Sequence, residues 1–245
     1  LPQIVDALKT RADAGDSRAA CRLAIELLRC THLSQVSPHP SGSPPPDVML
    51  ANRGNFAAAD RFAEMEIRKI QLLQKCSAVD KQLIRQAPRY LAAAARAGVP
   101  EAMMRYAKGD HHGVSGLGFA GDPEFDRWRR ESPEMLLRAA RSGQPEAVRT
   151  LAYVYRSDST PYAALVPDDP VMGRAWTLLD RRLHGQAADP DSSLGATGEV
   201  QAAALAKQWH QQYFNNAPPA AIVPGVRLTH LQAPSQPLEN ERFCE

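Results

Sequence analysis

The sequence predicts an all-α protein, an α/α solenoid of about four helix-turn-helix repeats with loop insertions. Alanine is abundant, while aromatic residues make up only 6% of the chain. Alanine favours helices, whereas aromatic and β-branched residues favour strands. No segment sustains the alternation of apolar and polar residues that predicts a strand. Three segments centred on a glycine share one apolar pattern, as the units of a repeat array do.

Helical periodicity covers most of the chain. We predict helices over residues 1–14, 17–31, 55–76, 79–97, 132–157, 169–184 and 198–214, the segment 132–157 as a helix pair, with one more helix opening at "GVPEAMMRYAKGD". Within 79–97, Pro88 is tolerated only at a break or in a new first turn, because a proline inside a helix removes a hydrogen bond and clashes with the preceding turn.

Segments rich in proline, glycine or serine separate these helices. The proline-rich segment 34–54 and the glycine-rich segment 109–124 are predicted to be loops inserted into the array, and "GQAADPDSSLGATG" is a third loop. We therefore divide the chain into a single solenoid domain, residues 1–216, and a C-terminal tail, residues 217–245. The tail is rich in proline and lacks periodicity, so we expect it to lie extended on the surface of the body.

The repeat is visible when three segments are aligned on Gly15, Gly98 and Gly143. Positions seven and three residues before the glycine hold Leu8, Leu91 and Leu136, then Ala12, Ala95 and Ala140. Positions four, eight and nine residues after it hold Ala19, Ala102 and Ala147, then Leu23, Tyr106 and Leu151, then Ala24, Ala107 and Ala152. Alanines let two helices pack closely, and the larger residues fill the core between neighbouring pairs. The unit is therefore a helix, a tight turn and a second helix.

The residues around each glycine explain the turn. Glycine fits the left-handed position just after a helix C-terminus, where a Cβ atom is costly. Pro100 and Pro145 then suit the first turn of the next helix, and the glutamates that follow them complement its dipole. In the first copy, Asp16 or Ser17 can cap the helix instead.

The pattern A-x-x-G-x-x-x-A-x-x-x-[LY]-A resembles the Sel-one-like repeat, a short relative of the tetratricopeptide repeat. The segment "LVPDDPVMGRAWTLL" resembles the connecting loop and next helix of that family, which implies a fourth unit. Its matching residues are Asp169, the pair Arg174–Ala175, Trp176 and the pair Leu178–Leu179. The three aligned copies lie further apart than a regular repeat, so the resemblance is to a degenerate array with insertions.

The four cysteines, Cys21, Cys30, Cys76 and Cys244, show no metal-ligand spacing and are expected to form two disulfides in an oxidising compartment. The alternative is four buried thiols in a cytosolic protein. Cys21 and Cys30 lie on one predicted helix, about 13 Å apart, whereas a disulfide needs Cα atoms about 6 Å apart. They cannot pair with each other. We expect Cys30 with Cys76 and Cys21 with Cys244; the swapped pairing is the alternative.

Charge and hydropathy narrow the classes of partner. The 29 lysines and arginines nearly balance 27 acidic residues, which gives a net charge of +2. The chain therefore has no overall field for nucleic acid or an anionic membrane, and we expect neither a nucleic-acid partner nor a transmembrane segment. The start "LPQIVDALKT" suggests a mature form from which a signal peptide has been removed.

Several motifs that resemble catalytic or metal sites lack the context they need. "GLGFAG", residues 116–121, has no strand before it and no helix directly after it, as a dinucleotide loop requires. "GVSGL" has Leu117 where a nucleophile elbow needs glycine. His111 and His112 are adjacent in a loop, and adjacent histidines rarely share one metal ion. We predict no catalytic residue, no cofactor and no metal site.

The segment "FDRWRRE", residues 125–131, is the best local candidate for a partner contact. It combines Trp128 with Arg127, Arg129 and Arg130, and tryptophan and arginine are enriched at binding hot spots. The alternative is that Trp128 anchors this insertion to the helical body while the arginines lie in water. Further candidates are Arg96 and Arg141, each two residues before a repeat glycine; the alternative is that they only complement a helix dipole.

Arrays of helical hairpins present a long curved surface for binding. The expected function is a non-enzymatic protein–protein interaction module of the bacterial envelope, an adaptor or regulator that is periplasmic or secreted. The family resemblance implies a more specific alternative, an immunity protein that neutralises a secreted antibacterial toxin. It also implies an enzyme of cell-wall or β-lactam chemistry, but the chain contains no S-x-x-K motif of that type.

Overall fold

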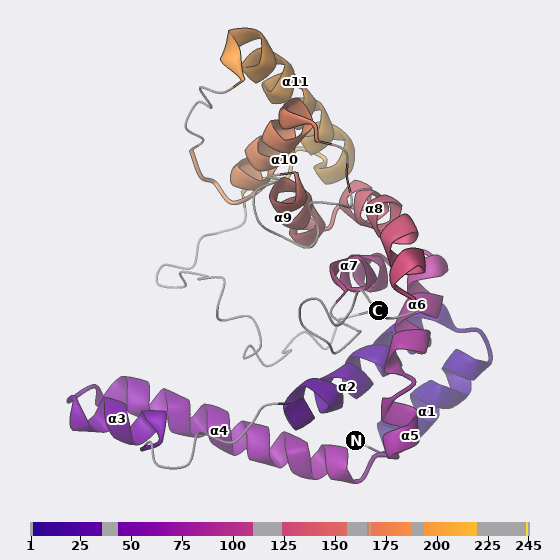
Figure 1. Ribbon diagram of the computed structural model, residues 1–245, viewed down its shortest axis with the longest axis vertical. Coiled ribbons are helices and arrows are strands. Elements are labelled where there is room, and N and C mark those ends of the chain that lie inside the picture. The colour runs from indigo at the N-terminus through magenta and orange to yellow at the C-terminus, as the bar shows by residue number, and fades with distance from the viewer. Residues whose placement is uncertain are drawn as a thin grey trace. The chain divides into compact units, whose positions relative to one another are not determined.

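The computed structural model describes residues 2–35, 44–109, 124–155, 166, 168–187, 194–219 and 244. Throughout these residues the regular structure is helical (Figure 1), which confirms the all-α class. The helices are α1 (Pro2–Asp13), α2 (Ser17–Gln35), α3 (Pro46–Asn52), α4 (Phe56–Ser77), α5 (Lys81–Ile84), α6 (Ala87–Arg96), α7 (Pro100–Lys108), α8 (Phe125–Arg141), α9 (Pro145–Val154), α10 (Pro170–Leu183) and α11 (Gly195–Phe214).

The helices differ from the predicted ones at three places. The proline-rich segment 34–54 contains α3, and Pro46 occupies its first turn, where a proline is tolerated. The predicted helix 79–97 is divided into α5 and α6, and Pro88 lies in the first turn of α6. Helix α8 begins at Phe125, several residues before the predicted pair 132–157, so "FDRWRRE" is helical.

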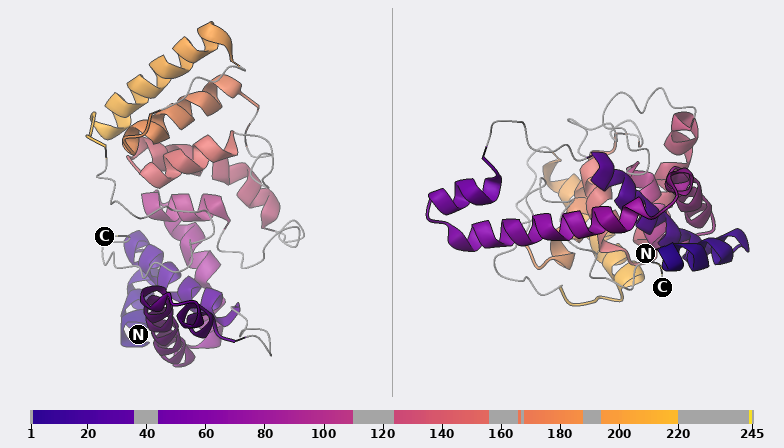
Figure 2. Two further views of the ribbon diagram at one scale, coloured as in Figure 1. Left: turned by 90° about the vertical axis from the view of Figure 1, so that its left-hand side faces the viewer. Right: turned by 90° about the horizontal axis from the view of Figure 1, so that it is seen from below.

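The chain divides into two compact units, which the predicted single domain over residues 1–216 does not anticipate. Unit 1 comprises Leu1–Ala93 with Leu228–Glu245, and unit 2 comprises Ala94–Arg227. In unit 1, α1 packs on α2, α3 packs on α4, and α2 also contacts α4 and α5. In unit 2, successive helices pack on one another from α7 to α11, and α11 also contacts α8. Figure 2 shows α3 lying beside the first half of α4, and α9, α10 and α11 side by side.

Two disulfides lie in unit 1. Cys30 bonds to Cys76, with Cα atoms 5.5 Å apart, and Cys21 bonds to Cys244, with Cα atoms 5.8 Å apart. This is the expected pairing, and the exclusion of a Cys21–Cys30 bond is confirmed. The first bond joins α2 to the C-terminal end of α4. The second joins α2 to the penultimate residue of the chain.

Five glycines end a helix in the same way. At Gly15, Gly54, Gly98, Gly143 and Gly185 the φ angle lies between 63° and 93°. At each one, the glycine N–H donates to the carbonyl three residues earlier and the next N–H donates to the carbonyl five residues earlier. These two bonds define the Schellman motif. The turn therefore recurs about every 40 residues, and Gly54 fills the wide gap between the first two aligned copies.

The helices that follow four of these turns start in one of two ways. After Gly15 and Gly54, the side chains of Asp16 and Asn55 accept the N–H groups of Ala19 and Ala58, at 3.0 and 3.3 Å. After Gly98 and Gly143, a proline stands in the first turn instead. A helix start leaves backbone N–H donors unpaired. The side-chain cap accepts from one of them, and the proline has no N–H group to leave unpaired.

The repeated positions after the glycine lie in the core of their units, whereas of the positions before it Leu8 and Ala12 in the first copy are only half-buried. All nine residues at four, eight and nine positions after Gly15, Gly98 and Gly143 are buried; they are Ala19, Leu23, Ala24, Ala102, Tyr106, Ala107, Ala147, Leu151 and Ala152. The shared residues therefore carry the packing of the helices. The surface that distinguishes one hairpin from the next comes from residues that the copies do not share.

Candidate protein-binding surface on helix α8

Helix α8 has a buried face and an arginine-rich exposed face. The buried side chains are Trp128, Ser132, Met135, Leu136, Ala139 and Ala140. The exposed side chains include the arginines Arg127, Arg129, Arg130, Arg138 and Arg141. Four of these recur at spacings of three, eleven and fourteen residues from Arg127, which places them on one side of a helix. We call Arg127, Arg130, Arg138 and Arg141 the α8 arginine face. Arg129 is exposed but lies at least about 100° away from each of them around the helix.

Trp128 belongs to the core and not to the arginine face. Its side chain is 2% exposed, and its Nε1–H donates to the backbone carbonyl of Tyr106 on α7 at 2.9 Å. Its ring also lies against Gly109, where an added Cβ atom would stand 3.5 Å from the ring. The geometry fits the alternative role of an anchor, and the indole is inaccessible to a partner that approaches the exposed face of α8.

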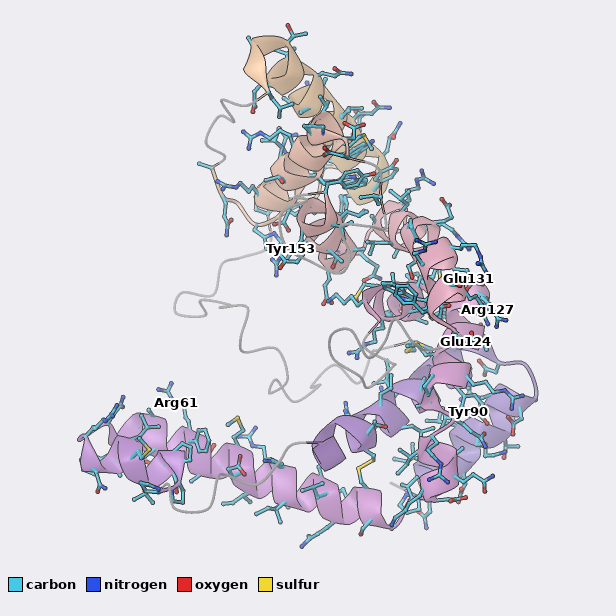
Figure 3. All side chains as sticks on the ribbon, viewed as in Figure 1. Arg61, Tyr90, Glu124, Arg127, Glu131 and Tyr153 are labelled. Carbon is cyan, nitrogen blue, oxygen red and sulfur yellow. A yellow bond between two sulfur atoms is a disulfide. The ribbon has the colours of Figure 1, made fainter. Side chains whose placement is uncertain are left out.

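Arg96 is also engaged inside unit 2. Its guanidinium donates to both carboxylate oxygens of Glu131 at 3.0–3.3 Å and lies 5.8 Å from the centre of the Tyr106 ring. The Tyr106 hydroxyl donates to the same carboxylate at 2.9 Å. Figure 3 shows Glu131 on α8, following Glu124 and Arg127 along the chain. The cluster ties the ends of α6 and α7 to α8, and so fixes the helix that carries the arginine face.

The electrostatics of this cluster favour a neutral tyrosine and a charged glutamate. Burial and the hydrogen bond to Glu131 raise the pKa of Tyr106 to about 12. Burial alone would raise the pKa of Glu131, but the bonds from Arg96 and Tyr106 outweigh it, so this pKa is lowered. The bond to Glu131 raises the pKa of Arg96. At neutral pH the cluster is therefore an ion pair with a neutral phenol bound to it.

The tyrosine makes the stability of unit 2 sensitive to alkaline pH. The pKa of Tyr106 is raised in the folded state, so an unfolded chain ionises this phenol from about pH 10 while the folded chain ionises it near pH 12. We expect the free energy of unfolding to fall over this interval, and Tyr106→Phe to remove part of the fall. Urea denaturation at a series of pH values measures it. Equal slopes for the variant and the unaltered chain would contradict the assignment.

Most of the arginine face remains available for binding. Arg127 pairs with Glu124 at 3.1 Å, and Arg141 pairs with Glu134 at 3.7 Å, but all four side chains are about half exposed or more. Such pairs contribute little and exchange readily. Arg130 and Arg138 form no ion pair with another residue of the described ranges. The face therefore offers positive charge that the rest of the described unit does not neutralise.

Sequence reasoning found part of this site. It singled out Arg127, Arg129, Arg130 and Arg141, which the structure brings to one helix, but it missed Arg138. The signal was the spacing of the arginines, which becomes visible only once residues 125–141 are read as a single helix. Pro133 concealed that continuity, since a proline inside a helix is uncommon.

Other candidate features lie outside the described residues or are unsupported within them. His111, His112 and the motifs over residues 113–117 and 116–121 fall in the segment that the structure does not describe. Among the residues that it does describe, no group of three histidines, cysteines or carboxylates could hold a metal ion. No helix in these ranges is both long enough and apolar enough to cross a membrane.

Comparisons with known proteins add no relative to this picture. No protein-family model matches the chain. Neither the curated proteins nor the solved structures contain a significant match to it. The function must therefore be argued from the surface that the fold presents.

Proposed function

We propose that this chain is a non-enzymatic protein-binding module, an α-solenoid adaptor or regulator of the bacterial envelope. Its partner is a protein that presents an acidic segment to the α8 arginine face. The observation that carries the proposal is the set of four exposed arginines on one side of helix α8, two of them, Arg130 and Arg138, without an ion pair in the described residues. Arginine is favoured at protein interfaces because its planar guanidinium binds carboxylates through paired hydrogen bonds.

The recurring hairpins support a binding role. Five helix ends share one turn geometry at intervals of about 40 residues, and the helices that follow three of them bury matched alanines. Units of this kind bury their common residues in the core and present their variable residues to a partner. We propose on this basis that the chain belongs among degenerate Sel-one-like arrays, with the Gly54 and Gly185 hairpins as additional units.

The disulfides support the proposed location. Cytosolic thiols are kept reduced, whereas disulfides persist in secreted and periplasmic proteins. The two bonds join segments that are far apart in the sequence, with separations of 46 and 223 residues. A protein that depends on such bonds is suited to the envelope or the extracellular space, so the proposed partner is an envelope or secreted protein.

A charge-reversal pair tests the arginine face. The oxidised chain, used as bait in nuclease-treated envelope extract, is expected to retain a partner that Arg130→Glu combined with Arg138→Glu loses at least tenfold. Reversal replaces attraction by repulsion at the centre of the face. Arg18→Glu with Arg85→Glu makes the same change in net charge at exposed sites in unit 1 and is expected to retain the partner. Captured proteins are quantified by mass spectrometry.

Two outcomes would contradict the proposal. Equal retention by both double variants would show that the α8 arginine face is not the binding surface. Loss of all binding after nuclease treatment would show that nucleic acid, and not an acidic protein, occupies the face. Raising the salt concentration should weaken the binding of an acidic partner to the unaltered chain, because salt screens exposed charges.

A further inference from the structure

Helix α4 exposes a stripe of large apolar side chains. Phe56, Ile67 and Ile70 are 66%, 55% and 53% exposed. Counted from Phe56, Ile67 is 11 residues and Ile70 is 14 residues further along the chain. The three side chains therefore lie within about 60° of one another around the helix. Ala63 lies on the same side and completes the stripe. Large apolar side chains gathered on one helix face mark an interaction surface more often than scattered ones do.

The hairpin that carries this stripe is packed less fully than the other hairpins. Ala58, Phe62 and Ala63 occupy the positions four, eight and nine residues after Gly54, and all three are only half-buried. The same positions after Gly15, Gly98 and Gly143 are buried. Of the 22 residues of α4, only Ala59 and Cys76 are buried. The second helix of this hairpin therefore keeps apolar surface that its counterparts bury.

Charge is distributed unevenly along one side of the stripe. Asp60 and Glu64 flank its first half, and Arg68 and Lys75 flank its second half. At 100° per residue these four fall on the same side of the stripe. Arg61, in the first half, lies furthest from the stripe on that side, and its Nε–H donates to the carbonyl of Ala57 within the same helix. Glu64 and Arg68 pair within the helix at 3.1 Å, but both are well exposed. An exposed ion pair of this kind contributes little to stability, so each residue can pair with a charge on another molecule at little energetic cost.

We propose that the α4 stripe binds a second copy of this chain, with the two α4 helices antiparallel about a two-fold axis near Ile67. A two-fold axis perpendicular to both helices brings the same flank of each helix together and reverses their directions. The acidic half of each flank then faces the basic half of the other. Ile67 lies near the axis, and Ala63 of one copy faces Ile70 of the other.

Charge complementarity selects this arrangement over a parallel one. In a parallel pair, Asp60 and Glu64 would face the opposite flank of the second copy, whose charged residues Glu66 and Lys69 pair with each other. The acidic and basic halves of the charged flank would then find no opposite charge in the second copy. In the antiparallel pair, Glu66 lies near the axis, and its own Lys69 at 3.5 Å offsets its charge. The sequence of α4 is thus complementary to itself in one direction only.

The size of the face sets the expected affinity. A helix of 22 residues is about 33 Å long, and one such face offers less than the 800 Å² or so per partner that a standard interface buries. We therefore expect a reversible dimer. Sedimentation equilibrium of the oxidised full chain, from about 1 to 300 µM, should show a monomer–dimer equilibrium with a dissociation constant in the micromolar range.

Ile67→Glu tests the stripe. Placing a carboxylate near the axis removes apolar burial from both copies and sets two like charges close together, so the dissociation constant should rise by about 30-fold or more. Ile4→Glu is the matched control, because Ile4 is 57% exposed but lies on α1. It should leave the equilibrium unchanged. Circular dichroism shows whether both variants remain folded.

A charge exchange tests the direction of the helices. Glu64→Arg and Arg68→Glu are each expected to weaken self-association, since each sets like charges opposite one another twice in the dimer. A chain that carries both changes should dimerise as the unaltered chain does, and an equimolar mixture of the two single variants should form a mixed dimer. The double variant also keeps opposite charges at positions 64 and 68 of the same helix. A change in helix stability therefore does not account for its behaviour.

Three results would overturn the inference. The first is a chain that remains monomeric at 300 µM, which would show that no second copy binds. The second is equal dimerisation by the Ile67 and Ile4 variants, which would place the interface elsewhere. The third is a double variant that fails to recover, which would exclude the antiparallel pairing. Reversal of Arg130 and Arg138 on α8 should not affect this equilibrium, so failure here is distinguishable from failure of the proposed partner surface.

Discussion

Trp128→Ala is expected to lower the free energy of unfolding of unit 2 by about 4 kcal/mol, because truncating a buried aromatic side chain loses its transfer free energy and leaves a cavity. The indole is almost wholly buried and joins α8 to the carbonyl of Tyr106 on α7. Its loss also leaves that carbonyl without its indole donor. The effect should appear as an earlier transition in urea, with unit 1 unchanged.

The tryptophans make this measurement specific. All three tryptophans of the chain lie in unit 2, and Trp176 and Trp209 stack with ring centres 4.0 Å apart. They remain as fluorescence reporters of unit 2 after Trp128 is removed. Arg129→Ala, at the adjacent exposed position, should change the free energy of unfolding by less than about 0.5 kcal/mol. A loss below about 1 kcal/mol for Trp128→Ala would contradict its role as an anchor.

The helices were predictable where the local signals were complete. Gly98 and Gly143 are each followed, after one residue, by a proline and a glutamate. Nearby residues therefore indicate both the end of one helix and the start of the next. Gly54 has Ala51, Ala58 and Ala63 at the repeat positions but Asp47 where the other copies have leucine. The proline-rich context then favoured a loop. Helix α3 forms because it packs on α4, and a local sequence pattern does not reveal such a tertiary contact.

The site was predictable only in part because burial depends on tertiary contacts. Tryptophan and arginine side by side in "FDRWRRE" indicated binding, but successive residues of a helix point in different directions. Trp128 turns toward α7, while Arg127, Arg129 and Arg130 turn to solvent. Arg96 was a candidate because it stands two residues before the repeat glycine Gly98, yet Glu131 from another helix binds it. No spacing in the sequence connects residues 35 positions apart.

Removal of the Cys30–Cys76 disulfide tests the stability of unit 1, as Trp128→Ala tests that of unit 2. Cys30→Ala with Cys76→Ala should lower the free energy of unfolding of this unit by about 3–4 kcal/mol, because the bond closes a loop with a sequence separation of 46 residues in the unfolded chain. Alanine avoids placing a hydroxyl group in the core. The loss should be concentrated in α4, whose main contacts to other helices are with α3 and α2.

Hydrogen exchange resolved by mass spectrometry separates this effect from a general loss of folding. Peptides from α4 should lose most of their protection, since Ala59 is the only other buried residue of that helix. Peptides from unit 2 should exchange as before. Cys21→Ala with Cys244→Ala is the control: it breaks the other bond of unit 1 but leaves α4 joined to α2, so α4 should stay protected. Equal protection of α4 in both double variants would show that packing, and not the covalent bond, holds α4 in place.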